Sequence, residues 1–148
     1  MNSEKSWLIL FIAILIAGCS SSVQPDGKNS YTGTVTWNGV PLPAGALTVY
    51  SEQGAADGAE IHNGAFSIRT MPGQKTISVV AEREIGTPPP TERIPDPTPV
   101  KFQYLPESVN SASILKVDFS ADPALPVSIE LKGKEREPSK DALQPSES

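Results

Sequence analysis

The sequence is short of the residues that build several common kinds of site. A single cysteine among 148 residues excludes an internal disulfide bond and a cysteine-rich zinc site, and a single histidine, His62, excludes histidine-rich metal clusters. Aromatic residues make up only 6% of the chain. Basic residues number 12 against 17 acidic ones, which gives a net charge of −5. Because nucleic-acid binders carry basic patches, this charge balance is a poor match for nucleic acid.

Long apolar runs and long helical patterns are also missing. The longest apolar run covers residues 7–17, whereas a membrane-spanning helix needs about 20 apolar residues. Proline is abundant instead, with 15 residues beside 11 glycines. Proline and glycine at this level favour short strands joined by many turns.

The N-terminal segment is typical of a secretion signal. The apolar run at residues 7–17 fits the core of a signal peptide, which we place at residues 1–18. The segment ends in Ile-Ala-Gly-Cys at residues 16–19, and this pattern resembles the lipobox of bacterial lipoproteins. The resemblance implies cleavage between Gly18 and Cys19, followed by lipidation of Cys19 with acyl chains such as palmitate.

A lipidated Cys19 would place the chain at a bacterial membrane, because several acyl chains exceed what stable anchoring requires. Ser20, rather than aspartate, follows the cysteine, and this favours the periplasmic face of the outer membrane over the inner membrane. The polar stretch that follows has no periodicity, so we expect residues 19–30 to hold the lipid and form a flexible tether. The competing interpretations are an ordinary signal peptide and a buried core segment, each with a cysteine there by chance.

Residues 31–132 alternate short apolar segments with turn signals, which predicts one β-rich domain. The strongest turn signals are Asn38-Gly39 and Asn63-Gly64, which put glycine where a tight turn needs a positive φ. The expected strands are residues 31–37, 46–50, 60–62, 65–70, 75–81, 114–119 and 127–131. This pattern predicts an all-β fold, a seven- to eight-stranded Greek-key β-sandwich of the Ig-like kind.

The apolar positions that alternate along these strands predict the core. The predicted core consists of Val35, Trp37, Leu47, Val49, Phe66, Ile68, Ile77, Val79, Ile129 and Leu131.

Proline is concentrated in residues 86–99. Because proline removes backbone donors, this stretch cannot lie inside a sheet, and we expect an extended surface loop. Residues 100–104 are expected to form a short strand or an edge segment. The charged and polar residues 133–148 predict a disordered tail.

Three segments together resemble a known family. Residues 33–49 read Gly-Thr-Val-Thr-Trp-Asn-Gly-Val-Pro-Leu-Pro-Ala-Gly-Ala-Leu-Thr-Val, residues 63–68 read Asn-Gly-Ala-Phe-Ser-Ile, and residues 71–79 read Met-Pro-Gly-Gln-Lys-Thr-Ile-Ser-Val. Their order is similar to that of carboxypeptidase-regulatory-like domains, although Lys75 stands where that family has an aromatic residue. The resemblance implies a transthyretin-like sandwich over most of the chain and a non-catalytic module.

Few residues point to catalysis. His62 has Glu60 and Asp57 near it in sequence but no accompanying nucleophile, so we expect a surface position on a strand. Glu82 and Glu84 suit at most a weak calcium contact, and a solvated surface is the simpler interpretation. The sequence therefore predicts no enzyme, no metal site and no cofactor.

Aromatic and proline side chains are the remaining candidates for binding. The aromatic residues that could form a carbohydrate platform are Trp37, Tyr50, Phe102 and Tyr104. The competing interpretation is that Trp37 fills the core and Tyr50 caps it. The candidate contacts for a protein partner are Pro88, Pro89, Pro90, Phe102 and Tyr104, because proline-rich segments are common ligands of aromatic grooves.

These observations predict a membrane-anchored envelope lipoprotein. Its non-catalytic sandwich is expected to serve a structural or protein-interaction role, with another envelope protein as the partner. The alternative is a carbohydrate- or small-ligand-binding module at the cell envelope, with a glycan as the partner.

Overall fold

The computed structural model of the chain describes residues 26–140, 142 and 143. The expected signal peptide, its cleavage site at Gly18 and the lipidated Cys19 lie outside the described residues. The last part of the expected tether is attached to the sandwich. Arg69 Nη2 donates to both carboxylate oxygens of Asp26 at 2.9 Å, and Lys28 forms a salt bridge with Asp57.

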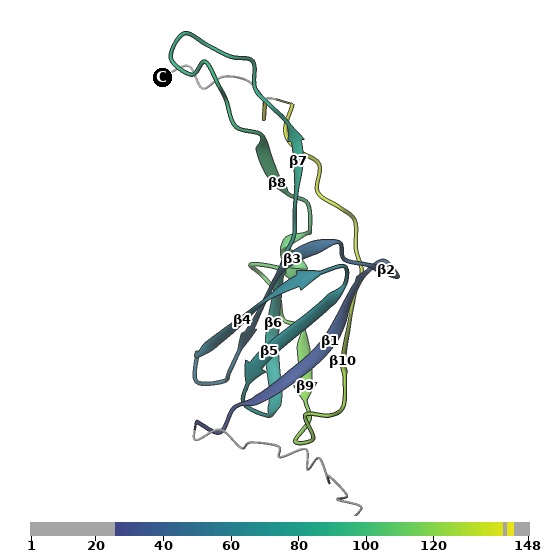
Figure 1. Ribbon diagram of the computed structural model, residues 1–148. Helices are drawn as coiled ribbons and strands as arrows, with labels where there is room; N and C mark the ends of the chain where they lie inside the picture. Colours follow the sequence, from purple (N-terminus) through teal and green to yellow (C-terminus); the bar gives the residue numbers. More distant parts are fainter. Residues whose placement is uncertain (1–25, 141, 144–148) are drawn as a thin grey trace, which may run out of the picture.

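The regular secondary structure of the described chain consists almost entirely of β-strands (Figure 1). A single 3₁₀ turn, η1 (Glu107–Val109), is the only helix between residues 26 and 140, and it is far too short to cross a membrane. The strands are β1 (Asn29–Trp37), β2 (Val40–Pro41), β3 (Ala44–Tyr50), β4 (Ala56–His62), β5 (Ala65–Thr70), β6 (Gly73–Val80), β7 (Glu82–Gly86), β8 (Val100–Gln103), β9 (Lys116–Phe119) and β10 (Val127–Leu131). The all-β prediction is confirmed.

One curled sheet forms both layers of the sandwich. Its strand order is β10-β1-β5-β4-β3-β6-β9, with the short β2 added to β1. β4 pairs with β3 along its whole length, but it pairs with β5 only where Ile61 meets Phe66 and His62 meets Ala65. The sheet therefore folds over at β4, and the flank of β10, β1 and β5 packs against the flank of β3, β6 and β9.

The core lies between these two flanks. The rings of Tyr31 on β1 and Phe119 on β9 meet edge to face with 5.2 Å between their centroids, and the Tyr31 hydroxyl donates to the backbone oxygen of Ser120 at 2.7 Å. All of the predicted core residues are buried. The core also contains hydrophobic residues outside the predicted list, which are Tyr31, Leu42, Ile61, Ala81, Tyr104, Leu105, Val109, Phe119 and Val127.

Both Asn-Gly turns adopt the predicted conformation. The φ angles are 50° at Asn38 and 84° at Gly39, and 50° at Asn63 and 79° at Gly64. Positive φ at both central residues defines the turn whose twist matches that of antiparallel strands. The turns therefore position β2 beside β1 and β5 beside β4.

β7 and β8 leave the sandwich as a separate hairpin. β7 follows β6 directly after Ala81, and it pairs with β8 in antiparallel fashion. The proline-rich residues 87–99 join the far ends of the two strands, where a missing backbone donor costs no ladder hydrogen bond. Figure 1 shows the hairpin and this loop extending away from the sandwich. Residues 82–103 are termed the arm below.

Candidate functional site

The arm is fixed to the sandwich at its root. Tyr104 donates its backbone N–H to the oxygen of Ala81 at 3.2 Å, and Ala81 donates its own N–H to Gln103 Oε1 at 3.0 Å. Tyr104 and Leu105 are both buried. The root of the arm is therefore part of the core, and this fixes the direction in which the arm leaves it.

The segment after β10 packs along the arm. Arg136 donates its backbone N–H to the oxygen of Tyr104 at 2.8 Å, and its guanidinium lies 5.8 Å from the centroid of the Phe102 ring. Glu135 Oε2 accepts from Arg83 Nη1 at 2.7 Å. The first part of the segment that the sequence predicts as a tail thus has defined contacts with the arm.

The arm has two different faces, because side chains alternate along its strands. Arg83 lies opposite Phe102 in the ladder, and these two residues are the ones that contact the tail. Glu84 lies opposite Lys101 on the other face, and Glu82 shares that face. One face of the arm therefore contacts the tail, while the other presents charged side chains.

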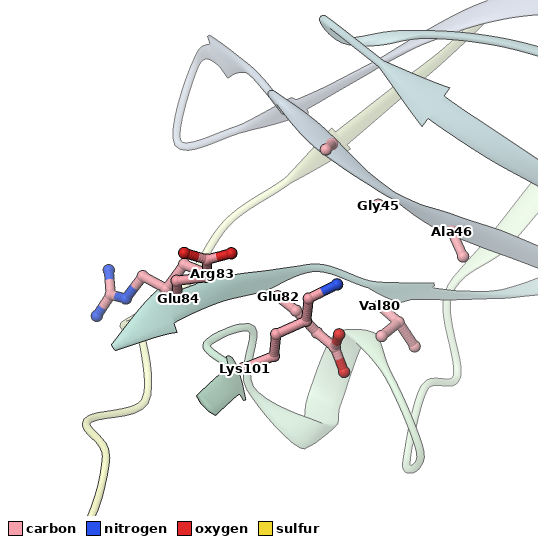
Figure 2. A pocket seen from close by; sticks show the side chains of 8 residues that line it. Gly45, Ala46, Val80, Glu82, Arg83, Glu84 and Lys101 are labelled. Atoms are coloured by element: carbon pink, nitrogen blue, oxygen red, sulfur yellow. The ribbon is translucent and has the colours of Figure 1, made fainter. Parts of the chain in front are cut away.

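A wedge opens where the arm diverges from β3. β3 pairs with β6 only from Ala46 onward, and the chain turns away from β3 after Val80, so the start of β3 and β7 separate (Figure 2). The wedge has a volume of about 440 Å³. Its lining consists of Ala44, Gly45, Ala46, Val80, Glu82, Arg83, Glu84 and Lys101.

A second and more apolar cavity, of about 530 Å³, adjoins the wedge. The two are contiguous because Ala44, Glu82 and Arg83 line both. The other residues that line the second cavity are Trp37, Asn38, Val40, Pro41, Leu42, Pro43, Tyr104 and Glu135. The two cavities together are termed the arm-base groove.

Two aromatic side chains in the apolar half of the groove have unusual surroundings. Trp37 is only 7% exposed, and its indole Nε1 has no hydrogen-bond partner among the described residues. Buried donors are nearly always paired, so this N–H is an unused donor. The guanidinium of Arg83 lies 5.3 Å from the centroid of the Tyr104 ring. Burial raises the pKa of the Tyr104 hydroxyl, and Glu135 adds to this rise while Arg83 opposes it.

The charged half of the groove holds carboxylates without a counter-ion. Arg83 is paired with Glu135, whereas neither Glu82 nor Glu84 makes a salt bridge within the described part of the chain. Lys101 lies opposite Glu84 in the ladder, but no salt bridge joins them. The groove therefore combines an apolar cavity with two unpaired carboxylates against the single ammonium of Lys101, and this excess of negative charge suits a ligand that is both apolar and basic.

The structure separates the predicted partner contacts. Pro88, Pro89 and Pro90 lie in the loop at the far end of the arm (Figure 1). Phe102 is half-buried beneath the guanidinium of Arg136. Tyr104 follows the last residue of the arm at its root, is 9% exposed and contributes its ring to the core.

The aromatic candidates for a carbohydrate platform do not form one exposed cluster. Trp37 is buried, as the competing interpretation expects, and so is Tyr104. Phe102 is half-buried, and Tyr50 is 41% exposed at the end of β3 that is remote from the groove. A flat stacking surface for a sugar ring is therefore missing from the described residues.

His62 occupies the strand surface position that the sequence predicts. Its Nε2 lies 3.0 Å from Glu60 Oε2, and both side chains are largely exposed. Within the described ranges no group of three or more histidine, cysteine, aspartate or glutamate residues could hold a metal ion. Glu82 and Glu84 share a face of β7 with Lys101 across from them, rather than a further carboxylate.

Sequence reasoning missed the tail residues that brace the arm. Arg83 and Glu135 are 52 positions apart, and no local pattern connects two charges at such a separation. The sequence after Gly133 is polar, which on composition alone predicts a free tail. Residues 40–43 form a wall of the groove, and this role depends on where the arm leaves the sandwich.

The groove and the arm are the features on which a functional proposal must rest. No protein-family model, curated protein or solved structure matches this chain.

Proposed function

We propose that this chain is a lipoprotein of the bacterial cell envelope, anchored through an acylated Cys19, and that its β-sandwich is a non-catalytic module that binds another envelope protein through the arm. One observation carries the proposal. The arm leaves the sandwich at the end opposite the one where the described chain begins (Figure 1), and the groove lies at the base of the arm. An anchor on the N-terminal side would leave the arm pointing away from the membrane.

β1 provides the scale of this separation. It begins at Asn29 near the start of the described chain and ends at Trp37 in the wall of the groove. Its nine residues span roughly 30 Å at a rise of about 3.3 Å per residue. The sandwich would therefore act as a spacer between the lipid anchor and the surface that meets the partner.

The proposed domain type is the carboxypeptidase-regulatory-like one. It is supported by the order of the segments at residues 33–49, 63–68 and 71–79 and by the all-β sandwich that they form. The proposed location is the periplasmic face of the outer membrane, and it is supported by the lipobox-like residues 16–19 followed by Ser20.

A non-catalytic role is supported by the chemistry of the groove. The residues that line it include no serine, cysteine or histidine, and its only arginine is paired with Glu135. His62 lies on an exposed strand face with only Glu60 beside it. The nucleophile and base that acyl- or group-transfer chemistry requires are therefore not gathered there.

A small-ligand-binding module is the second candidate. It is favoured by the apolar cavity of about 530 Å³, a volume within the range of ligand pockets. A carbohydrate ligand is less well supported, because the four aromatic candidates do not form one platform.

The experiment that tests the proposal is site-specific photo-crosslinking in the native cells. A photo-reactive residue replaces Glu84 on the arm, and the matched control carries it at Glu60, which is exposed on β4. We expect one defined envelope protein to be crosslinked from position 84 and not from position 60. A Cys19→Ala form is expected to lose both membrane fractionation and the crosslink.

Two results would contradict the proposal. If the Cys19→Ala form fractionates with membranes as the native protein does, the anchor is not Cys19. If positions 84 and 60 give the same products, the arm has no dedicated partner.

A further inference from the structure

We propose that the arm-base groove takes an extended segment of the partner, which adds as a strand to the free edge of β7 and carries lysine or arginine beside apolar side chains. This inference rests on the proposed function, since it assigns the chemistry of the partner that the arm meets. Three independent features of the groove support it.

The first feature is an unpaired strand edge. β7 pairs with β8 on one side, from Glu82 to Gly86. No backbone hydrogen bond in the described part of the chain joins its other edge to a strand. The start of β3 does not cover this edge, because Ala44 and Gly45 precede the first β3–β6 pair. An extended chain in the wedge would find unused backbone donors and acceptors, which is the basis of recognition by strand addition.

The second feature is the charge of the wedge. Glu82 and Glu84 project from one face of β7 and make no salt bridge among the described residues. An added strand places alternate side chains on that same face. Lysine or arginine at those positions would meet the two carboxylates, which outnumber the single ammonium of Lys101 in the wedge. The net charge of −5 on the whole chain also favours the approach of a basic segment.

The third feature is the apolar cavity that continues the wedge. Trp37, Val40 and Tyr104 line it, and the apolar side chain of Val40 is 64% exposed. A bound segment that covers this apolar surface would remove it from water, which is favourable. An apolar residue next to the basic ones would therefore be held here.

Charge argues against the arm tip of a second copy as the occupant. The tip carries Glu92 and Asp96 with the single base Arg93. It would bring further negative charge to Glu82 and Glu84. Residues 87–99 also contain six prolines, which lack the donors that pairing along β7 requires.

The test uses synthetic peptides and the folded domain without its signal. The probe is a short peptide that alternates lysine with valine, and the matched control peptide has glutamate in place of each lysine. We expect the lysine peptide to shift the backbone amide NMR signals of residues 82–86 and 44–46. We expect the double variant Glu82→Gln/Glu84→Gln to bind this peptide about tenfold more weakly, while Glu60→Gln binds it as the native protein does.

Three outcomes would overturn the inference. The first is equal binding of the lysine and glutamate peptides. The second is a set of shifted signals on the β9 and β10 edges instead of β7. The third is a dimer in sedimentation that the lysine peptide does not dissociate. The crosslink from position 84 is an independent result. If that crosslink forms but the peptides do not bind, the proposed function stands and only the strand-addition chemistry fails.

Discussion

Gly33 occupies the place on β1 where the neighbouring backbone comes closest. A Cβ at this position would lie 2.2 Å from the backbone oxygen of Val127 and 2.6 Å from Phe66 Cζ. Because the first of these atoms belongs to the paired strand β10, it cannot move aside without breaking the pairing. The absence of a side chain at residue 33 is therefore a requirement of the sandwich.

We predict that Gly33→Ala lowers the free energy of unfolding by about 2–3 kcal/mol, the upper part of the range for overpacked sites. The matched control is Gly58→Ala on β4, where the nearest atom to the new Cβ is 3.9 Å away. The control is expected to change stability by less than about 0.5 kcal/mol. Urea denaturation measures both variants, and equal midpoints would show that the β1–β10 contact tolerates a methyl group.

Asp57 is the residue through which acid is expected to weaken the fold. Burial alone would raise the pKa of Asp57, but hydrogen bonds from Lys28 and Thr70 and the charges of Lys28 and Lys75 outweigh it and hold the pKa below its usual value of 3.8. A carboxyl with a lowered pKa in the folded state stabilises the fold above its unfolded pKa. That stabilisation is lost as the pH falls below about 4 and through the lower, folded-state pKa.

We therefore predict that Asp57→Asn destabilises the protein at pH 7 and flattens the loss of stability below pH 4. Thermal melts across pH 2–7 measure this dependence. Asp118→Asn, at an exposed position on β9, is the matched control and is expected to keep the native pH profile. Identical acid profiles for the Asp57→Asn variant and the native protein would contradict the prediction.

At the scale of elements, local sequence signals predicted the strands of the sandwich well. The strands at residues 65–70 and 127–131 have the predicted bounds, and their inner and outer residues alternate as expected. The Asn-Gly turns were readable because a two-residue turn is determined by its own residues. Such signals need no knowledge of what lies across the core.

The arm was only partly predictable. Residues 100–104 were expected to form a strand or an edge segment, but β7 was not identified, because Glu82, Arg83 and Glu84 have no apolar alternation. Its strand conformation comes from pairing with β8 across a proline-rich loop. The groove was not predicted because its walls come from segments that are far apart in the sequence, at residues 37–46, 80–84, 101, 104 and 135.

The tail is expected to hold the arm in place. A two-stranded hairpin alone is marginally stable in water, and here Glu135 and Arg136 contact Arg83, Phe102 and the backbone of Tyr104. We predict that truncation after Gly133 makes the amides of β7 and β8 exchange at least tenfold faster with deuterium. The amides of β3 and β6 are the internal control and should keep their rates.

An unchanged exchange rate in β7 and β8 would show that the hairpin is held by its root alone. A uniform increase in all strands would show instead that the tail stabilises the whole sandwich.

At the scale of the whole molecule, the stability of the sandwich is expected not to depend on the arm tip, residues 87–99. The loop at residues 87–99 joins β7 and β8 at their ends far from the sandwich. None of the core residues lies in this loop. We predict that replacing residues 87–99 by Asn-Gly raises the free energy of unfolding by about 1–2 kcal/mol, because the closed loop is much shorter. Chemical denaturation measures this change.

A loss of several kcal/mol in that variant would show that the tip packs on the sandwich. A stable variant also serves the crosslinking experiment, because it removes Pro88, Pro89 and Pro90 and leaves the groove intact. Comparing the two forms then assigns the partner contact to the tip or to the groove.

The parallel pairing of β1 with β10 has a mechanical consequence. β1 starts at the end of the sandwich remote from the arm, whereas β10 ends at Leu131 beside the arm, and five residue pairs from Gly33–Val127 to Trp37–Leu131 join the two strands. Tension between an N-terminal anchor and a partner that grips the tail after β10 would pull these strands along their length in opposite directions. Their hydrogen bonds lie across that direction, so they would share the load in shear and would not open one after another.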